Sequence, residues 1–274
     1  MKVKDLFFKI WVIFSGLIII LTTFGLFFYL LYKGIGVVTP EFILTSPKGI
    51  PLGTEGGIFP AIIGSLMSGL ISGLFGGILG LCTAIYLTFY STNEKIRKYI
   101  LLALQCLAGI PSVVIGLFGY TILIVGLGVN KSLLSASITL TIMIIPFIAI
   151  RMKKALEETS KEQFISSLSL GIPKGYTIVK LVIPSAFKYI MTSLGLGIVF
   201  AMGATAPVMF TGAVIMSGVP GKLTDPFMAL PYHLYILVNE GLSLEMAYGT
   251  AFVLIVIVLL INIICHFIGS YEDM

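Results

Sequence analysis

Long runs of apolar residues, separated by short polar segments, dominate the sequence. Each run approaches or exceeds the roughly 20 residues that a helix needs to cross the hydrocarbon core of a bilayer. The pattern predicts an all-α integral membrane protein with six transmembrane helices, and we treat residues 1–274 as one membrane domain. The predicted spans are residues 10–32, 59–90, 99–125, 132–150, 187–216 and 246–268.

Small residues recur every four positions in the second predicted span. One row is Gly69, Gly73 and Gly77, and a second is Ser68, Ser72, Gly76 and Gly80. Small residues at this spacing let helix backbones approach closely in lipid. We expect tight helix packing along both rows, with a hinge or a pore-lining face as the alternative.

Proline interrupts two spans. Pro111 lies inside the third span, and Pro207 follows the segment 203–206 in the fifth. A proline frees a backbone carbonyl and bends the helix, so these positions predict breaks at membrane depth. A further apolar segment, residues 226–238, is too short to cross and is predicted to be re-entrant or to lie on the membrane surface.

Composition and charge agree with a membrane protein. Hydrophobic residues make up 58% of the chain and charged residues 11%, whereas soluble domains carry about 25% charged residues. If the N-terminus is cytoplasmic, the inner segments hold 13 of the 17 basic residues, and only Lys33, Lys48, Lys131 and Lys222 are outside. This asymmetry predicts a multi-pass plasma-membrane protein with both termini in the cytoplasm. The membrane-type composition also removes nucleic acid as an expected partner and leaves membrane lipid.

The sequence contains no recognisable catalytic, metal-binding or phosphate-binding motif. The three cysteines lie in apolar runs without a ligand spacing, the two histidines do not pair, and there is no glycine-rich phosphate loop. We therefore expect no enzymatic activity, no cofactor and no metal site.

Residues 151–186 form a long polar insert, predicted to be a cytoplasmic loop. Within it, Ser160 and Gln163 fit a capping box, Phe164, Ile165 and Leu168 form an apolar patch, and Gly171 suits a helix end. These signals predict a helix over residues 161–170 with an exposed apolar edge. The helix could dock a protein partner or lie on the inner leaflet, because both uses need the same amphipathic design.

The insert resembles the cytoplasmic loop of ABC-importer permeases. That motif reads Glu-Ala-Ala, three residues, Gly, and further on an apolar position and Pro. Here Gly171 and Pro184 match, whereas Ile165 stands at the glutamate position and Ser166 and Ser167 at the alanines. The resemblance implies a coupling helix that docks an ATPase. The implied docking residues are Phe164, Ile165, Ser166, Ser167, Leu168, Gly171 and Pro184.

More of the chain resembles one branch, the permeases of phosphate importers of the PstA type. The resembling segments are residues 56–60, 108–112, 116–119, 146–151, 205–207, 210–211 and 229–231. In one departure, Ala204 stands where that family usually has a glutamate.

The resemblance implies a type I ABC-importer permease that moves inorganic phosphate into the cytoplasm. Its implied partners are a second homologous permease, two ATP-binding subunits that hydrolyse ATP, and an extracytoplasmic phosphate-binding protein. Two alternatives stay open. One is a permease for another oxyanion, such as molybdate or sulfate, and the other is a membrane scaffold or secondary carrier without an ATPase.

Hydroxyl groups, amides freed at the broken helices and one cation are the groups available to an anion in the membrane. Candidate residues of the translocation path are Pro111, Ser112, Thr139, Arg151, Thr205 and Pro207. Arg151 falls at the cytoplasmic end of the fourth span, where it could instead serve as an interfacial anchor.

Overall fold

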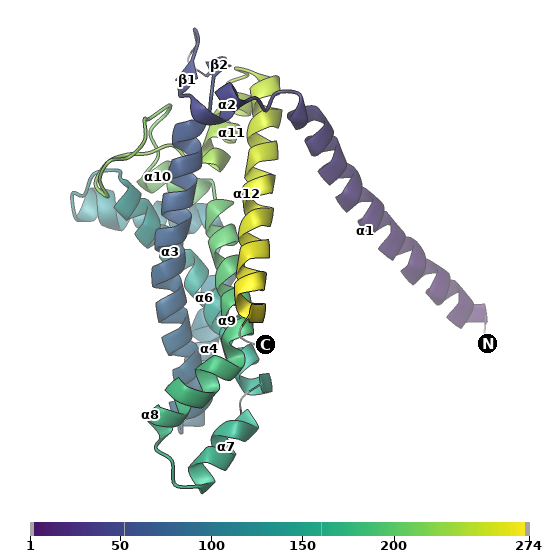
Figure 1. Cartoon of the computed structure of the whole chain (residues 1–274), viewed down its shortest axis with the longest axis vertical. Helices are drawn as coiled ribbons and strands as arrows, with labels where there is room; N and C mark the ends of the chain where they lie inside the picture. The colour runs from purple at the N-terminus through teal and green to yellow at the C-terminus, as the bar shows by residue number, and fades with distance from the viewer. Residues whose placement is uncertain (1–2, 52, 160, 272–274) are drawn as a thin grey trace.

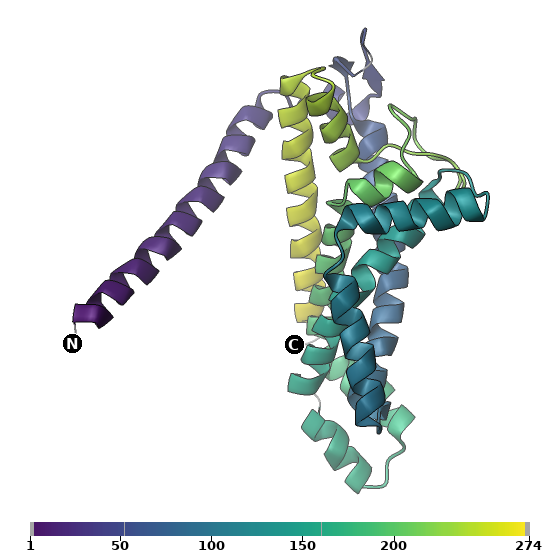
Figure 2. The same ribbon diagram turned by 180° about the vertical axis from the view of Figure 1, so that it is seen from behind.

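The computed structural model describes residues 3–51, 53–159 and 161–271, and these residues form a helical membrane bundle (Figures 1 and 2). Five helical stretches are long and apolar enough to cross a membrane, and a sixth span results if one bent pair is counted. The long helices are α1 Val3–Ile35, α3 Phe59–Ile85, α6 Leu133–Thr159, α9 Ile183–Met202 and α12 Leu244–Tyr271. The bent pair is α4 Glu94–Ala108 and α5 Ser112–Gly119.

Shorter elements gather at the two ends of the bundle. At one end lie α2 Pro40–Leu44, the two-stranded antiparallel hairpin β1 Pro47–Lys48 and β2 Glu55–Gly56, and α11 Leu230–Asn239. At the opposite end lie α7 Lys161–Ser169 and α8 Lys174–Thr177. The remaining elements are α10 Ala206–Thr211 and the π-helical segments η1 Tyr86–Tyr90, η2 Tyr120–Gly126 and η3 Ile178–Val182.

Helices α3, α6 and α9 pack together as the centre of the bundle, and the small residues of α3 make this possible. The row that includes Gly69 and Gly73 lies against Met202 and Ile198 of α9. In the other row, Gly80 lies against Ile148 of α6. A side chain on either row would collide with these neighbours. The packing interpretation of both rows is therefore confirmed.

Helix α1 leaves the bundle at an angle and touches it near one end (Figure 1). Its most apolar window has no buried residues. Contact with α12 is made where Gly34 packs on Phe252 and where the Tyr29 and Tyr248 hydroxyls lie 3.1 Å apart. An apolar helix exposed on nearly all sides is compatible only with lipid or another membrane protein as its neighbour.

The third predicted span is not one continuous helix. Its two halves, α4 and the stretch from Ser112 to Gly126, meet at an angle of 98°. The break falls at residues 109–111, where Pro111 precedes the first turn of α5 and its carbonyl accepts bonds from the amides of Val114 and Ile115. Gly109 and Pro111 together stop one helix and start another, so proline here turns the chain rather than bending a span.

Residues 151–159 belong to α6 and not to the loop, contrary to the predicted boundary at residue 150. Pro146 lies inside this continuous helix. Met152, Ala155 and Leu156 are buried and continue the apolar stripe of α6. Packing on that stripe keeps the chain helical into the polar segment.

The fifth span also differs from the prediction of residues 187–216. Helix α9 begins at Ile183, directly after η3, and ends at Met202. Only the short α10 follows, after a break at residues 203–205. Residues 226–238 contain most of α11, whose Leu230, Tyr232 and Leu237 are buried. Helix α11 packs against α12 and α3, so it is a buried part of the bundle end rather than a surface helix.

Candidate functional site

Helix α7 forms where the sequence predicts a helix, over nine residues of the polar insert. Ser160 of the expected capping box lies outside the described residues. At the other end, Gly171 has a φ of +80°, the left-handed conformation that a helix end of this type requires. The amide of Gly171 donates to the carbonyl of Leu168, and that of Ile172 donates to Ser167. The predicted stop is therefore confirmed.

The apolar edge of α7 is not the one that the sequence predicts. Phe164 is only 7% exposed, and its ring packs on Phe89 with the centroids 4.5 Å apart. Leu168 is half-buried against the same core. The exposed apolar residues are Ile165, at 56%, and Leu170, at 79%. The helix turns Phe164 inward because the α3 end offers it an aromatic partner.

The remaining residues of the predicted docking set divide between the two faces of the loop. Ser166, Gly171 and Pro184 are exposed, whereas Ser167 is buried and its hydroxyl lies 2.8 Å from that of Thr177. A groove of about 450 Å³ lies between α7 and Leu181 of η3, beside the exposed face. It is lined by Glu162, Gln163, Ser166, Ser167, Leu170, Ile172 and Leu181. This outer face combines hydroxyl, amide and apolar groups, so it suits a protein surface.

The short helices that follow the two breaks pack against each other. Helix α5, which starts at Ser112, packs against α10, which starts just after Thr205. Pro111 is exposed and Ser112 half-buried, whereas Pro207 is buried. Four of the six candidate path residues thus lie at the starts of two short helices that pack together, Pro111 and Ser112 at α5 and Thr205 and Pro207 at α10.

A hollow of about 380 Å³ opens beside the second break, between Thr205 and α11. Pro231, Tyr235 and Asn239 also line it. Thr205 is half-buried there, and its side chain does not cap α10.

Thr139 and Arg151 lie apart from the two breaks. Thr139 is fully buried under Gly119 of α5, and its hydroxyl donates to the carbonyl of Ser135, so it faces no hollow. Arg151 lies about 18 Å further along α6, twelve residues at the helical rise. Its guanidinium carbon is 5.4 Å from the centroid of the Phe147 ring.

Arg151 borders a polar hollow of about 250 Å³ between α6 and α9. The other lining residues are Lys154, Ala155, Glu158, Tyr189, Thr192 and Ser193. The hydroxyls of Thr192 and Ser193 donate to carbonyls of their own helix. The side-chain donors left for a ligand are those of Arg151, Lys154 and Tyr189, and Lys154 pairs with Glu158 at 3.7 Å.

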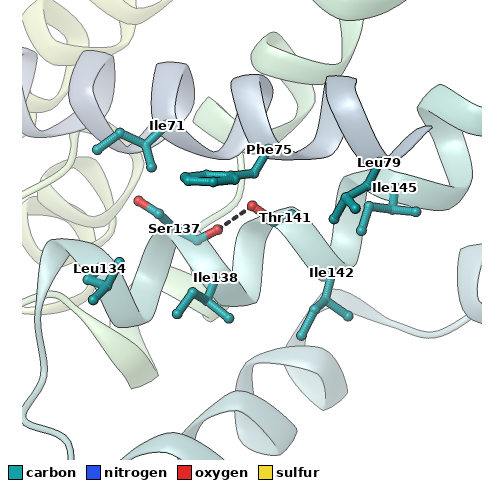
Figure 3. Close-up of a pocket in the computed structure, with 9 residues that line it drawn as sticks. All are labelled: Ile71, Phe75, Leu79, Leu134, Ser137, Ile138, Thr141, Ile142 and Ile145. Atoms are coloured by element: carbon teal, nitrogen blue, oxygen red, sulfur yellow. Dashed lines mark hydrogen bonds between the residues drawn. The ribbon is translucent and has the colours of Figure 1, made fainter. Parts of the chain in front are cut away.

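Helices α3 and α6 also enclose an apolar groove of about 410 Å³ (Figure 3). Ile71, Phe75 and Ile138 line its walls. Two hydroxyls face it, but Ser137 donates to Leu133 and Thr141 donates to Ser137 within α6. No hydrogen-bonding capacity is directed at a ligand, so this groove does not suit an anion.

A family model with the description "Binding-protein-dependent transport system inner membrane component" matches residues 76–271. The chain belongs to this family. It is a membrane-embedded permease subunit of an ABC importer, and the architecture is that of type I importers.

Named relatives agree with this family. The chain is 33% identical over 220 residues to the "Phosphate transport system permease protein PstA 2" of Mycobacterium bovis, covering 79% of this chain and 73% of the relative. It is 30% identical to the "Probable phosphate transport system permease protein PstA" of Methanocaldococcus jannaschii, with 94% and 91% coverage. The "Probable ABC transporter permease protein YqgI" of Bacillus subtilis is 25% identical, with 90% and 88% coverage.

Solved structures share the fold at low sequence identity. An inward-facing MetNI methionine ABC transporter chain superposes with a TM-score of 0.66 at 19% identity, over 77% of this chain and 94% of that one. A chain of a bacterial importer of the acidic polysaccharide alginate superposes with a TM-score of 0.59 at 17% identity, over 98% of both. These similarities establish the fold and nothing finer.

Three residues near the site escaped prediction from the sequence. Phe89 packs against Phe164 of α7, and the Thr177 hydroxyl is hydrogen-bonded to that of Ser167. Glu157 forms salt bridges with Arg97 at 2.7 Å and Lys153 at 2.6 Å. The i, i+4 spacing of Lys153 and Glu157 is a helix signal that could have extended α6. Phe89 carried no such signal, because its partner lies 75 positions away.

Proposed function

We propose that this permease subunit carries inorganic phosphate into the cytoplasm, driven by ATP hydrolysis on separate subunits. The assignment of phosphate as the substrate rests on similarity to relatives named as phosphate permeases. They are 33% identical over 79% of this chain and 30% identical over 94% of it. In this proposal the path is shared with a second homologous permease, and the exposed faces of α5 and α9 offer surfaces for it. Two ATP-binding subunits and an extracytoplasmic phosphate-binding protein complete the assembly.

The outer face of α7 is the proposed contact for an ATP-binding subunit. Ile165, Ser166 and Leu170 are exposed beside a groove, and the helix lies at the far end of the bundle from the β1–β2 hairpin (Figure 1). Helices α6 and α9 end or begin beside it, so a displacement of α7 reaches the bundle directly. The basic residues of this end support a cytoplasmic location for it, with both termini inside.

The proposed path runs from the α5 and α10 breaks to Arg151. At the breaks lie the half-buried Ser112 and Thr205 and the first amides of two short helices, which are suitable donors for an oxyanion without the cost of a buried charge. Arg151 supplies a positive charge at the inner end, near the hollow between α6 and α9. Ala204, next to the second break, contributes neither a charge nor a hydrogen bond through its side chain.

Two measurements test the proposal. The chain is expressed with its genomic partner genes in cells that lack their own phosphate importers, and uptake of labelled phosphate is measured with excess molybdate or sulfate. Uptake that only unlabelled phosphate suppresses supports the proposal; uptake suppressed by molybdate or sulfate, or no phosphate uptake, contradicts the assigned substrate. Purification of the solubilised protein asks whether an ATP-binding subunit and a second permease accompany it. Their absence would favour a scaffold or a secondary carrier.

A further inference from the structure

The inner face of α7 is fixed to the bundle by one aromatic pair. The Phe164 and Phe89 rings are tilted by 45°, with their centroids 4.5 Å apart. Both side chains are buried, at 7% and 9% exposure, and both belong to the main hydrophobic core. Phe89 lies in η1, the π-helical continuation of α3. The pair therefore joins the cytoplasmic helix to the end of a transmembrane helix that is distant in sequence.

A second contact on the same face reaches α9. The Ser167 hydroxyl lies 2.8 Å from that of Thr177, which is buried and directly precedes η3. Segment η3 then continues into α9 at Ile183. Helix α7 is thus held between the ends of two of the three central helices. Both ends are π-helical, a form that is rare and found mostly where a helix serves a function.

The two faces of α7 have separate tasks. Ile165 and Leu170 point outward and are exposed, while Phe164 and Ser167 point inward and are buried. A force applied to the outer face must pass through the inner contacts to reach the membrane. Packed rings transmit displacement because protein interiors are dense and resist compression. The hydroxyl pair is a single hydrogen bond, whereas the two rings touch over many atoms, so the aromatic pair is the stiffer connection.

We propose that Phe89 is a positioning residue for transport: through its ring it passes the displacement of α7 to the inner end of α3. This inference rests on the proposed function, in which α7 receives the ATP-binding subunit. Phe89 is buried beneath α7 and is not part of the exposed face that we assign to the ATP-binding subunit. Without its ring, α7 can move into the space left behind while α3 stays in place. ATP hydrolysis would then continue without productive transport.

The first test compares Phe89→Ala with Tyr90→Ala in the complete transporter. Tyr90 is an aromatic residue on the same π-helical turn, but it is 45% exposed. For Phe89→Ala we expect uptake to fall at least tenfold while the ATP-binding subunit still co-purifies and ATPase activity persists. Tyr90→Ala should transport as the wild type does. Wild-type uptake by Phe89→Ala, or loss of the ATP-binding subunit from it, would overturn the inference.

A second pair of variants remains informative if Phe89→Ala does not accumulate in the membrane. Phe89→Leu keeps apolar bulk without the ring and should show an intermediate loss of uptake. In a chain in which Cys82, Cys106 and Cys265 are replaced, Phe89→Cys with Phe164→Cys permits a short thiol cross-link. The reduced double variant lacks both rings and should transport poorly; if the two positions move as a unit, the cross-link should restore uptake. Higher uptake in the reduced form than in the cross-linked form would show that the two positions must separate, which contradicts the inference.

The experiments distinguish a failure of the proposed transport function from a failure of the proposed role of Phe89. If the wild-type chain neither binds an ATP-binding subunit nor supports phosphate uptake, the proposed function fails. If the wild-type chain does both and Phe89→Ala transports normally, only the role of Phe89 fails.

Discussion

The backbone of Gly116 lies directly against that of Ala206. A Cβ atom at Gly116 would be 3.0 Å from the carbonyl oxygen of Ala206 and 3.0 Å from the Phe210 ring. This contact holds the two broken helices, α5 and α10, together where the proposed path passes. Because the opposing atom belongs to the backbone, it cannot move aside as the end of a side chain would.

Replacing Gly116 by valine should therefore separate α5 from α10. We expect a loss of stability of about 1–3 kcal/mol, as for overpacked cores, and a larger loss of uptake. Gly16→Ala is a suitable control, since no atom lies within 4 Å of a Cβ built there. Uptake and thermal stability of the purified complexes check both effects. Normal transport by Gly116→Val would mean that the contact is not needed for the path.

Charges placed on the outer face of α7 should release the ATP-binding subunit. Ile165→Asp and Leu170→Asp change exposed residues, so the permease should insert and fold normally but lose the subunit on purification, with uptake at least tenfold lower. Leu44→Asp, at an equally exposed residue at the opposite end, should have no effect. Co-purification of wild-type amounts of subunit with both α7 variants would place docking elsewhere.

Phe164→Asp should behave differently from the two surface variants. It would bury a carboxylate at a site that is 7% exposed and leave the Phe89 ring without its partner. An unpaired buried charge is strongly destabilising. We expect less protein in the membrane and faster proteolysis within residues 161–173. A protein level equal to that of Ile165→Asp would contradict the buried position.

Substitutions of Gly171 should follow its backbone conformation rather than its surroundings. No atom lies within 4 Å of a Cβ there, but its φ is +80°. Alanine should cost about 1–2 kcal/mol, asparagine less, and proline most, because its ring fixes φ near −65°. Uptake should fall in the same order, and proline should uncouple the loop. An uptake that does not depend on the substituent would exclude a need for this turn.

Arg151→Gln should lower the rate of phosphate uptake about tenfold if its charge assists the anion at the inner end of the path. Arg151→Lys should restore part of the rate, because the charge remains without the planar guanidinium. Lys154→Gln is a control in the same hollow, since Lys154 is already paired with Glu158. Wild-type affinity and rate in Arg151→Gln would reduce Arg151 to an interfacial anchor.

Glu157→Gln should loosen the inner end of α4 from α6. Glu157 accepts from both Arg97 and Lys153, and its side chain is 28% exposed. Since exposed ion pairs contribute little, we expect a loss of about 1 kcal/mol or less, diminishing as salt is raised. Glu158→Gln, in a pair whose side chains are 75% and 65% exposed, should be neutral. Equal losses of stability in Glu157→Gln and Glu158→Gln would argue against a stabilising role for the salt bridges of Glu157 with Arg97 and Lys153.

Local chemistry made part of this structure predictable. The apolar runs are long enough to identify the spans, and residues 59–90 are helical throughout. Gly171 identified the end of α7, because few other residues adopt its φ. In each case the signal lies within a few positions of the feature that it specifies.

Features that depend on distant contacts were not predictable in the same way. Phe164 looked like a surface residue, since nothing near it in the sequence indicates that Phe89 covers it. The 98° turn at Pro111 exceeds an ordinary proline bend because α10 provides a surface for α5 to lie on. Residues 151–159 stay helical because packing outweighs the polar composition of that segment.

The seat of α7 limits how the loop could be exchanged between transporters. Residues 161–173 contain the exposed face, but the ring that supports it is at position 89, and Thr177 completes the support. A chimera that exchanges only residues 161–173 would place a foreign helix against Phe89 and Thr177, which would not fit it. To redirect this permease to another ATPase, the transplanted unit would need to include residues 86–90 and 151–186 together.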